Sequence, residues 1–159
     1  MKELVAIAEQ VATKLVARKQ TIAVAESSTG GLISASLLAV PGASAYFLGG
    51  AVVYTRDARR ILMDIPDDAM KGIRSASEPY ARLLAEQARR RFATDWGLSE
   101  TGATGPTGNR YGDAAGHSCM AVAGAATTVT TLETASNDRQ NNMHEFAKTA
   151  LNLLLMRLV

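Results

Sequence analysis

Short apolar runs alternate with amphipathic segments along most of this chain, and the alternation decides which class of fold is open to it. Apolar residues recur at helical spacing over residues 2–18, and the uninterrupted run Thr21–Ala25 is typical of a buried strand. Gly49 and Gly50 indicate a bulge or a close backbone approach within a second strand. The alternation continues with helices predicted over 32–40, 56–63 and 77–92 and with strands predicted over 47–55 and 97–101. Strands separated by helices predict a layered α/β domain.

The last third of the chain departs from this order. Residues 117–123 and 127–134 have strand character, and the short connection through Gly124 suits a hairpin of antiparallel strands. A final helix follows, with Asn137 as its N-cap and Gln140 three residues later, which is a capping-box pattern. The expected sheet is therefore mixed, with about five strands.

Composition excludes several classes of function. The 159 residues favour one domain, 1–159, and a 47% hydrophobic fraction supplies its core. A formal charge of +2 does not predict a surface for nucleic acid or membrane, so neither partner is expected. Cys119 is the only cysteine, which rules out an intrachain disulfide and a cysteine zinc site, and no metal is expected. The sequence shows no signal-peptide core and no apolar stretch of membrane length, so the predicted location is the cytoplasm.

A hydroxyl-rich turn, Glu26–Gly31, joins the first predicted strand to the helix that follows it. Open α/β sheets bind ligands beyond the carboxyl ends of their strands, and the backbone N–H groups at a helix start attract anions. The turn can therefore hold an anion, or present a serine nucleophile with N–H donors for an oxyanion. It lacks the Gly-Lys-Ser/Thr ending of a P-loop and the Gly-x-Ser-x-Gly elbow of α/β-hydrolases. An ordinary helix cap also accounts for the turn and is the simpler explanation.

Two further features allow both a binding and a structural explanation. Residues 102–116 carry five of the thirteen glycines and no predicted helix or strand, and a loop this long is usually functional or mobile. Glycine lets backbone N–H groups approach a ligand, whereas a flexible link between two strands is the alternative. Arg139 falls in the first turn of the last helix, where the dipole disfavours a cation by about 0.3–1 kcal/mol. A bound phosphate would reverse that mismatch, and a solvent-exposed arginine would tolerate it.

Five blocks of residues follow one another in the order of a known family. They are Glu26–Gly31, Pro41–Phe47, Val53–Arg59, Ala76–Glu78 and Thr101–Pro106. The first is similar to the family pattern Glu-Ser-Cys-Thr-Gly-Gly, and the last is similar to Thr/Ser-Gly-Ile-Ala-Gly-Pro. On these blocks the chain resembles the CinA C-terminal domain family, which includes the nicotinamide-nucleotide amidohydrolases. The resemblance covers nearly the whole chain.

That resemblance implies a three-layer α/β/α domain that forms a homo-oligomer. It implies a pyridine nucleotide as the small-molecule partner, and hydrolysis of the carboxamide of nicotinamide mononucleotide to nicotinate mononucleotide and ammonia, without a cofactor or a metal. By position, Ser27 would be the nucleophile, with Tyr54 and Arg59 beside it. The positions that would bind the substrate are Glu26, Ser28, Thr29, Gly30, Gly31, Thr101, Gly102, Thr104, Gly105 and Arg139.

The departures from the family pattern fall on the chemistry. Arg59 stands where the family has lysine, and arginine stays protonated in proteins, so it cannot act as a general base. His117 replaces a family threonine and lies either near the site or in a strand with its hydrogen bonds satisfied. The glycine segment is also altered, at Asn109–Ala114. Three hypotheses remain open: the deamidase, a nucleotide-binding relative that acts as a regulatory or interaction module, and a hydrolase of a different amide.

Overall fold

The computed structural model describes residues 1–159 and shows a mixed sheet of five strands, as predicted. The strand order is β2-β1-β3-β4-β5, and β1 pairs in parallel with both β2 and β3. The β3–β4 and β4–β5 pairs are antiparallel, which confirms the predicted hairpin. The strands are β1 (Ile22–Glu26), β2 (Phe47–Val52), β3 (Trp96–Ala103), β4 (His117–Ala123) and β5 (Thr127–Glu133).

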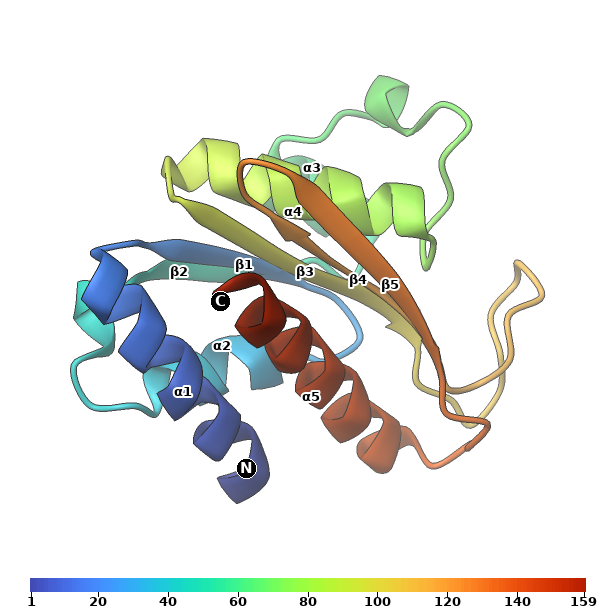
Figure 1. Ribbon diagram of the computed structural model, residues 1–159. Coiled ribbons are helices and arrows are strands. Elements are labelled where there is room, and N and C mark those ends of the chain that lie inside the picture. The colour runs from blue at the N-terminus through green and yellow to red at the C-terminus, as the bar shows by residue number, and fades with distance from the viewer.

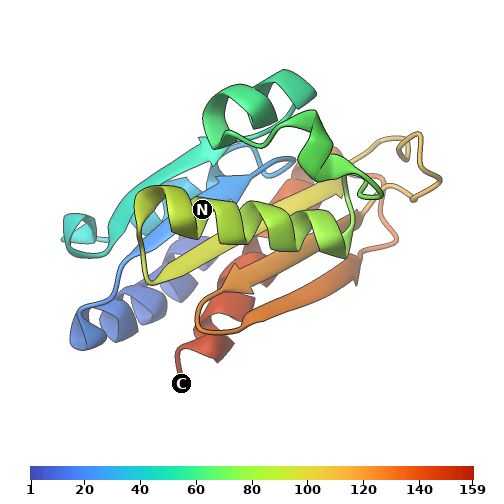
Figure 2. The same ribbon diagram turned by 90° about the horizontal axis from the view of Figure 1, so that it is seen from above.

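Helices cover both faces of the sheet, so the fold has three layers (Figures 1 and 2). One face carries α1 (Lys2–Arg18), α2 (Leu32–Leu38) and α5 (Arg139–Arg157). The other face carries α3 (Arg56–Met63) and α4 (Glu78–Phe92). None of these helices combines the length and the apolar character that a membrane crossing requires.

The larger core lies between the sheet and the layer of α1, α2 and α5. The periodic residues of α1, including Leu4, Val11 and Leu15, are fully buried there, and so is Phe146 of α5. Full burial of such a side chain is worth about 1.5–3 kcal/mol, so the helical pattern fixes which face of α1 meets the sheet.

On the other face, α4 packs unusually close to the sheet. A Cβ on Gly97 of β3 would lie 2.0 Å from the carbonyl oxygen of Ala85, so only glycine permits this approach. Gly49 of β2 has the same function against α4, because a Cβ there would lie 2.4 Å from the Phe92 ring. The register between β1 and β2 also shifts beside Gly49, which agrees with the predicted irregularity.

Several predicted boundaries were wrong by a few residues. β2 ends at Val52 rather than at 55, and β3 continues to Ala103 beyond the predicted end at 101. The N-cap of α5 is Asp138, whose side chain accepts a hydrogen bond from the Asn141 amide at 3.1 Å, and not Asn137. Asn and Asp cap helices equally well, so the local pattern could not choose between these neighbours.

Candidate functional site

A cavity of about 570 Å³ opens beyond the carboxyl ends of β1, β2 and β3. Such volumes are typical of small-molecule sites, and this edge is where open α/β sheets bind ligands. Ser27 follows β1, Val53 follows β2, and Gly102 lies near the end of β3. Arg59 of α3 and Tyr111 of the glycine segment complete the wall. The structure therefore brings together the three segments that the sequence analysis placed at one site.

The carboxylate of Glu26 caps α2 from inside the protein. It accepts hydrogen bonds from the amides of Gly31 at 2.8 Å and Ser34 at 2.9 Å, and from the hydroxyl of Thr29 at 2.7 Å. Glu26 is fully buried and does not line the cavity. Its negative charge occupies the positive end of α2, where the sequence allowed either an external anion or an ordinary helix cap.

A second buried carboxylate, Glu100 of β3, holds the same turn from below. It accepts the amides of Ser27 at 3.1 Å and Thr29 at 3.0 Å, and it also accepts the hydroxyls of Ser28 and Ser118. Burial raises the pKa of Glu100, and these hydrogen bonds act against that effect. The Ser27 and Thr29 amides both donate to this one residue of β3, and these hydrogen bonds fix the position of Ser27 at the cavity wall.

The N–H donors that the turn was expected to offer an oxyanion do not include the amides of Thr29–Gly31. The Thr29 and Gly31 amides are taken by Glu100 and Glu26, and the Gly30 amide donates to the Ser27 carbonyl at 3.1 Å. Among residues 27–31, the Ser28 amide alone has no acceptor. The amide that follows a serine nucleophile is a common oxyanion donor, so this group is the remaining candidate.

Arg59 lies at the buried end of the cavity. The N-cap of its helix is Thr55, whose hydroxyl accepts from the Ala58 amide at 3.0 Å, and this cap directs α3 over the site. The Arg59 residue is only 8% exposed, and its guanidinium lies 5.8 Å from the centre of the Tyr80 ring. Its one carboxylate contact is Nη2 to Oδ1 of Asp67 at 3.5 Å, and its Nε has no hydrogen-bond partner.

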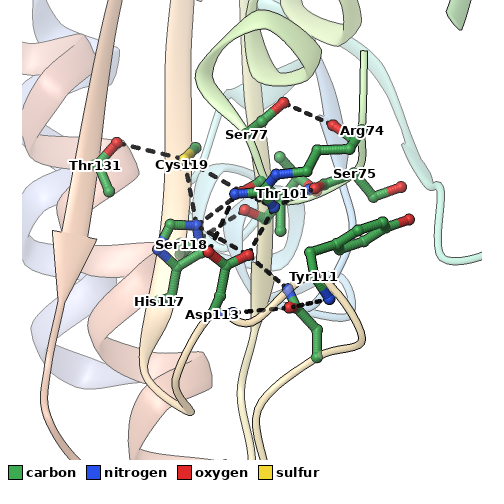
Figure 3. Close-up of polar contacts among 12 residues, drawn as sticks. Arg74, Ser75, Ser77, Thr101, Tyr111, Asp113, His117, Ser118, Cys119 and Thr131 are labelled. Atoms are coloured by element: carbon green, nitrogen blue, oxygen red, sulfur yellow. Dashed lines mark hydrogen bonds and ion pairs between the residues drawn. The ribbon is translucent and has the colours of Figure 1, made fainter. Parts of the chain in front are cut away.

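The glycine segment is held against the cavity by an ion pair. Arg74 donates to both carboxylate oxygens of Asp113, at 2.7 and 3.1 Å (Figure 3). Burial would raise the pKa of Asp113, but hydrogen bonds from Arg74 and Asn109 lower it below its usual value. The Tyr111 ring stacks with the guanidinium groups of Arg74 at 5.2 Å and Arg110 at 5.1 Å. The segment is therefore ordered by specific contacts where it faces the cavity.

His117 is a strand histidine with both ring nitrogens satisfied. Nδ1 contacts the Glu133 carboxylate, and Nε2 lies 2.7 Å from the carbonyl oxygen of Ala76. The side chain does not line the cavity, although Ala76 does. Of the two explanations that the sequence allowed, the structural one holds.

The predicted site residues divide into two groups. Ser27, Tyr54, Arg59, Thr101 and Gly102 line the cavity, although Tyr54 is 61% exposed. The others stand behind the wall or beside it; they are Glu26, Ser28, Thr29, Gly30, Gly31, Thr104, Gly105 and Arg139.

Arg139 supports the base of the glycine segment. Its Nη1 donates to the Gly105 carbonyl at 2.5 Å, and its Nη2 lies 3.4 Å from the Tyr54 hydroxyl. A backbone carbonyl thus accepts from the cation at the start of α5, where the sequence allowed either a bound phosphate or a solvent-exposed arginine.

Sequence reasoning missed three side chains that dominate the cavity wall. Arg56, Arg74 and Tyr80 all line it. Tyr80 had a weak signal, because it follows the Ala76–Glu78 block of the resemblance. Arg56 lay inside a matched block without any reason to single it out, and Arg74 had no signal at all.

Residues 4–158 match the family model described as the CinA C-terminal domain. The chain belongs to the CinA C-terminal domain family. A CinA-like protein of Anaeromyxobacter dehalogenans (strain 2CP-1 / ATCC BAA-258) is 38% identical over 148 residues, which is 93% of this chain and 36% of the relative. A CinA-like protein of Gloeobacter violaceus (strain ATCC 29082 / PCC 7421) is 41% identical over 122 residues, 77% of this chain and 29% of the relative. This CinA domain thus spans about a third of the length of these relatives.

Solved CinA structures share the fold of this domain. The competence or damage-inducible protein from Enterobacter asburiae superposes with a TM-score of 0.91 at 25% identity and covers 98% of each chain. The CinA superfamily protein from Klebsiella pneumoniae 700603 gives a TM-score of 0.91 at 22% identity, covering 98% of this chain and 97% of its own. The resemblance in fold to the CinA family is therefore confirmed by structure as well as by sequence.

Proposed function

We propose that this CinA domain binds a pyridine mononucleotide in the cavity and hydrolyses its carboxamide slowly or not at all. The observation that carries the proposal is the composition of the cavity wall, which has four arginines and three tyrosines but a single carboxylate, Asp67. Guanidinium groups bind phosphate with paired hydrogen bonds, and tyrosine faces attract a flat cationic ring. A pyridine mononucleotide carries both of these groups. The arginines and tyrosines are Arg56, Arg59, Arg74, Arg110, Tyr54, Tyr80 and Tyr111.

The wall contains no efficient base for Ser27. No lysine or histidine lines the cavity, and Arg59 stays protonated. Asp67 is hydrogen-bonded to Arg56, and this contact lowers the pKa of Asp67, which makes it a weaker base. General acid–base catalysis contributes about 10²–10⁴-fold, so without it turnover falls by that order.

Deamidation through Ser27 is the second candidate, and the free Ser28 amide favours it. In that reaction the Ser27 hydroxyl oxygen attacks the carboxamide carbon, and the hydroxyl proton leaves with the departing amine as ammonia. The Ser28 amide would stabilise the oxyanion, and water would then hydrolyse the acyl-enzyme to the acid.

Calorimetric titration with nicotinamide mononucleotide, run beside an ammonia assay on the same sample, tests the two candidates. We expect saturable binding with little ammonia release. A Ser27→Ala variant should keep the binding and lose any release that the native chain shows. Rapid release that depends on Ser27 would establish the deamidase, and absence of binding would refute the proposal.

A further inference from the structure

We propose that Arg59 makes the cavity selective for a ring that carries a carboxylate, so that nicotinate mononucleotide binds in preference to nicotinamide mononucleotide. This inference rests on the proposed function and names the ligand more narrowly. It concerns binding only and requires no covalent step.

The Arg59 side chain has a hydrogen-bond donor that the protein leaves unpaired. Arg59 is 8% exposed and lines the cavity, and its Nε is the one buried side-chain nitrogen or oxygen in the protein without a hydrogen-bond partner. Buried polar groups are nearly always paired, so this donor requires an acceptor that the protein does not supply. The missing partner must be an acceptor, because a guanidinium has donors only.

The positive charge of Arg59 is only partly compensated by the protein. Its nearest carboxylate, Asp67, is 3.5 Å away and has a side chain that is 50% exposed. Both oxygens of Asp67 already accept hydrogen bonds from Arg56. A buried cation with so little compensation favours a ligand anion that can reach it.

The chemistry of the two ring substituents then decides between them. A carboxylate offers two acceptor oxygens that match the Nε and Nη donors of arginine in a fork. A carboxamide offers one oxygen and an NH₂ group, and the NH₂ would face a guanidinium that cannot accept. With the carboxamide, one of the two contacts would therefore place the NH₂ donor against a guanidinium donor.

The burial of the lining residues indicates which end of the nucleotide reaches Arg59. The Arg59 guanidinium lies 5.8 Å from the centre of the Tyr80 ring, and the lining residues Tyr80, Val53 and Ala76 are 2–3% exposed. A flat pyridinium ring that carries one carboxylate, with no net charge, fits this apolar end, whereas a dianionic phosphate would be costly to bury there. Arg56 and Arg110 are exposed at the rim and suit the phosphate.

The test is calorimetric titration of nicotinate and nicotinamide mononucleotides into the native chain and into three variants. We expect the native chain to bind the acid at least about tenfold more tightly than the amide. Arg59→Gln, which removes the cation, should bring the two affinities within about twofold of each other by weakening the acid. Arg59→Lys replaces the planar fork of donors with a single amine, so it should retain only part of the preference.

Two controls separate this inference from the general role of the arginines. Arg110→Gln, at the rim, should weaken both ligands by the same factor because it acts on the shared phosphate. Arg60→Gln, the neighbour of Arg59 on α3 with a side chain that is 58% exposed, should change neither affinity.

The outcomes are distinct. Equal affinity of the native chain for the two ligands, or an acid preference that survives in Arg59→Gln, would overturn the inference and leave the proposed function standing. If neither mononucleotide binds, both are refuted.

Discussion

Two buried carboxylates, Glu26 and Glu100, determine the position of the residue at the centre of the site. In place of water, each carboxylate accepts hydrogen bonds from backbone amides in and after the turn that presents Ser27. Without them, buried amides would lack acceptors, which costs about 1–3 kcal/mol for each group. The serine is therefore held by polar contacts that never touch the ligand.

Substitution of Glu100 tests this role. Glu100→Leu should lower the free energy of unfolding by about 3 kcal/mol, because the Ser27 and Thr29 amides lose their acceptor. Glu100→Gln is the matched control: its oxygen keeps the amides, and its NH₂ group can donate to the Ser28 and Ser118 hydroxyls. It should cost about 1 kcal/mol or less in a urea titration. Equal loss in the two variants would show that charge, and not hydrogen bonding, is what matters.

Arg59→Lys tests whether the absence of a base is what limits catalysis. A buried lysine releases its proton readily and can then activate Ser27, so ammonia release from nicotinamide mononucleotide should rise at least about tenfold, or 1.4 kcal/mol of barrier. The gain should vanish in the double variant with Ser27→Ala. A variant that binds the ligand but shows no gain would place the limit in the altered segment Asn109–Ala114 instead.

The sequence identified Ser27 and Arg59 because they stand in matched blocks with distinctive chemistry. It did not identify Glu100, which lies 73 positions from Ser27 and meets it only when β1 and β3 pair. Arg74 was missed for the same reason, since its partner Asp113 is 39 positions away. Contacts of this range are set by tertiary packing, and a single sequence carries no local pattern for them.

At the scale of elements, the position of the glycine segment between β3 and β4 depends on a few side-chain contacts. Arg74 and Asp113 join it to the start of α4, and Asn109 closes it by accepting the amides of Tyr111 at 3.0 Å and Asp113 at 3.1 Å. The segment brings Arg110 and Tyr111 to the cavity only while these contacts hold.

Asp113→Asn should therefore loosen the segment without unfolding the domain. The variant loses the charged partner of Arg74, and we expect both mononucleotides to bind about tenfold more weakly. Limited proteolysis within residues 105–113 should become faster at the same time. Asp64→Asn is the control, because Asp64 has a side chain that is 83% exposed and pairs with Arg91 at 3.8 Å, outside the cavity wall. Unchanged affinity in Asp113→Asn would show that the segment keeps its place by other means.

The periodicity of the sequence predicted which segments form helices and strands, but it did not predict where each of them ends. The buried stripe of α1 and the apolar run of β1 are strong local signals, and both were predicted within one residue of their bounds. The end of β2 and the N-cap of α5 depend on how neighbouring segments pack. Asn142, for example, donates to the carbonyls of Thr104 and Ser136 and thereby fixes where α5 can begin.

For the whole molecule, His117 links three parts of the fold that are remote in sequence. Its ring joins β4 to Glu133 of β5 and to the Ala76 carbonyl before α4, and Asp113 of the glycine segment lies 3.7 Å from Nε2. The Cys119 sulfur lies 3.8 Å from Nε2 of His117, and Arg74 pairs with the same Asp113. Burial lowers the pKa of His117, but the hydrogen bonds to Glu133 and Ala76, with the charge of Asp113, outweigh burial and raise it above 6.5.

This raised pKa makes stability depend on pH with a definite sign. The folded state binds the His117 proton more tightly than the unfolded state, so the stabilisation is complete below pH 6.5 and is lost as pH rises through the folded pKa. Urea titrations from pH 6 to 9 should show the free energy of unfolding falling with pH in the native chain. His117→Phe should be less stable at low pH and should lose this component of the slope. Glu133→Gln keeps the ring but removes its anionic partner, so it should shift the fall to lower pH. A slope that is the same in the native chain and in His117→Phe would mean that another group governs the pH dependence.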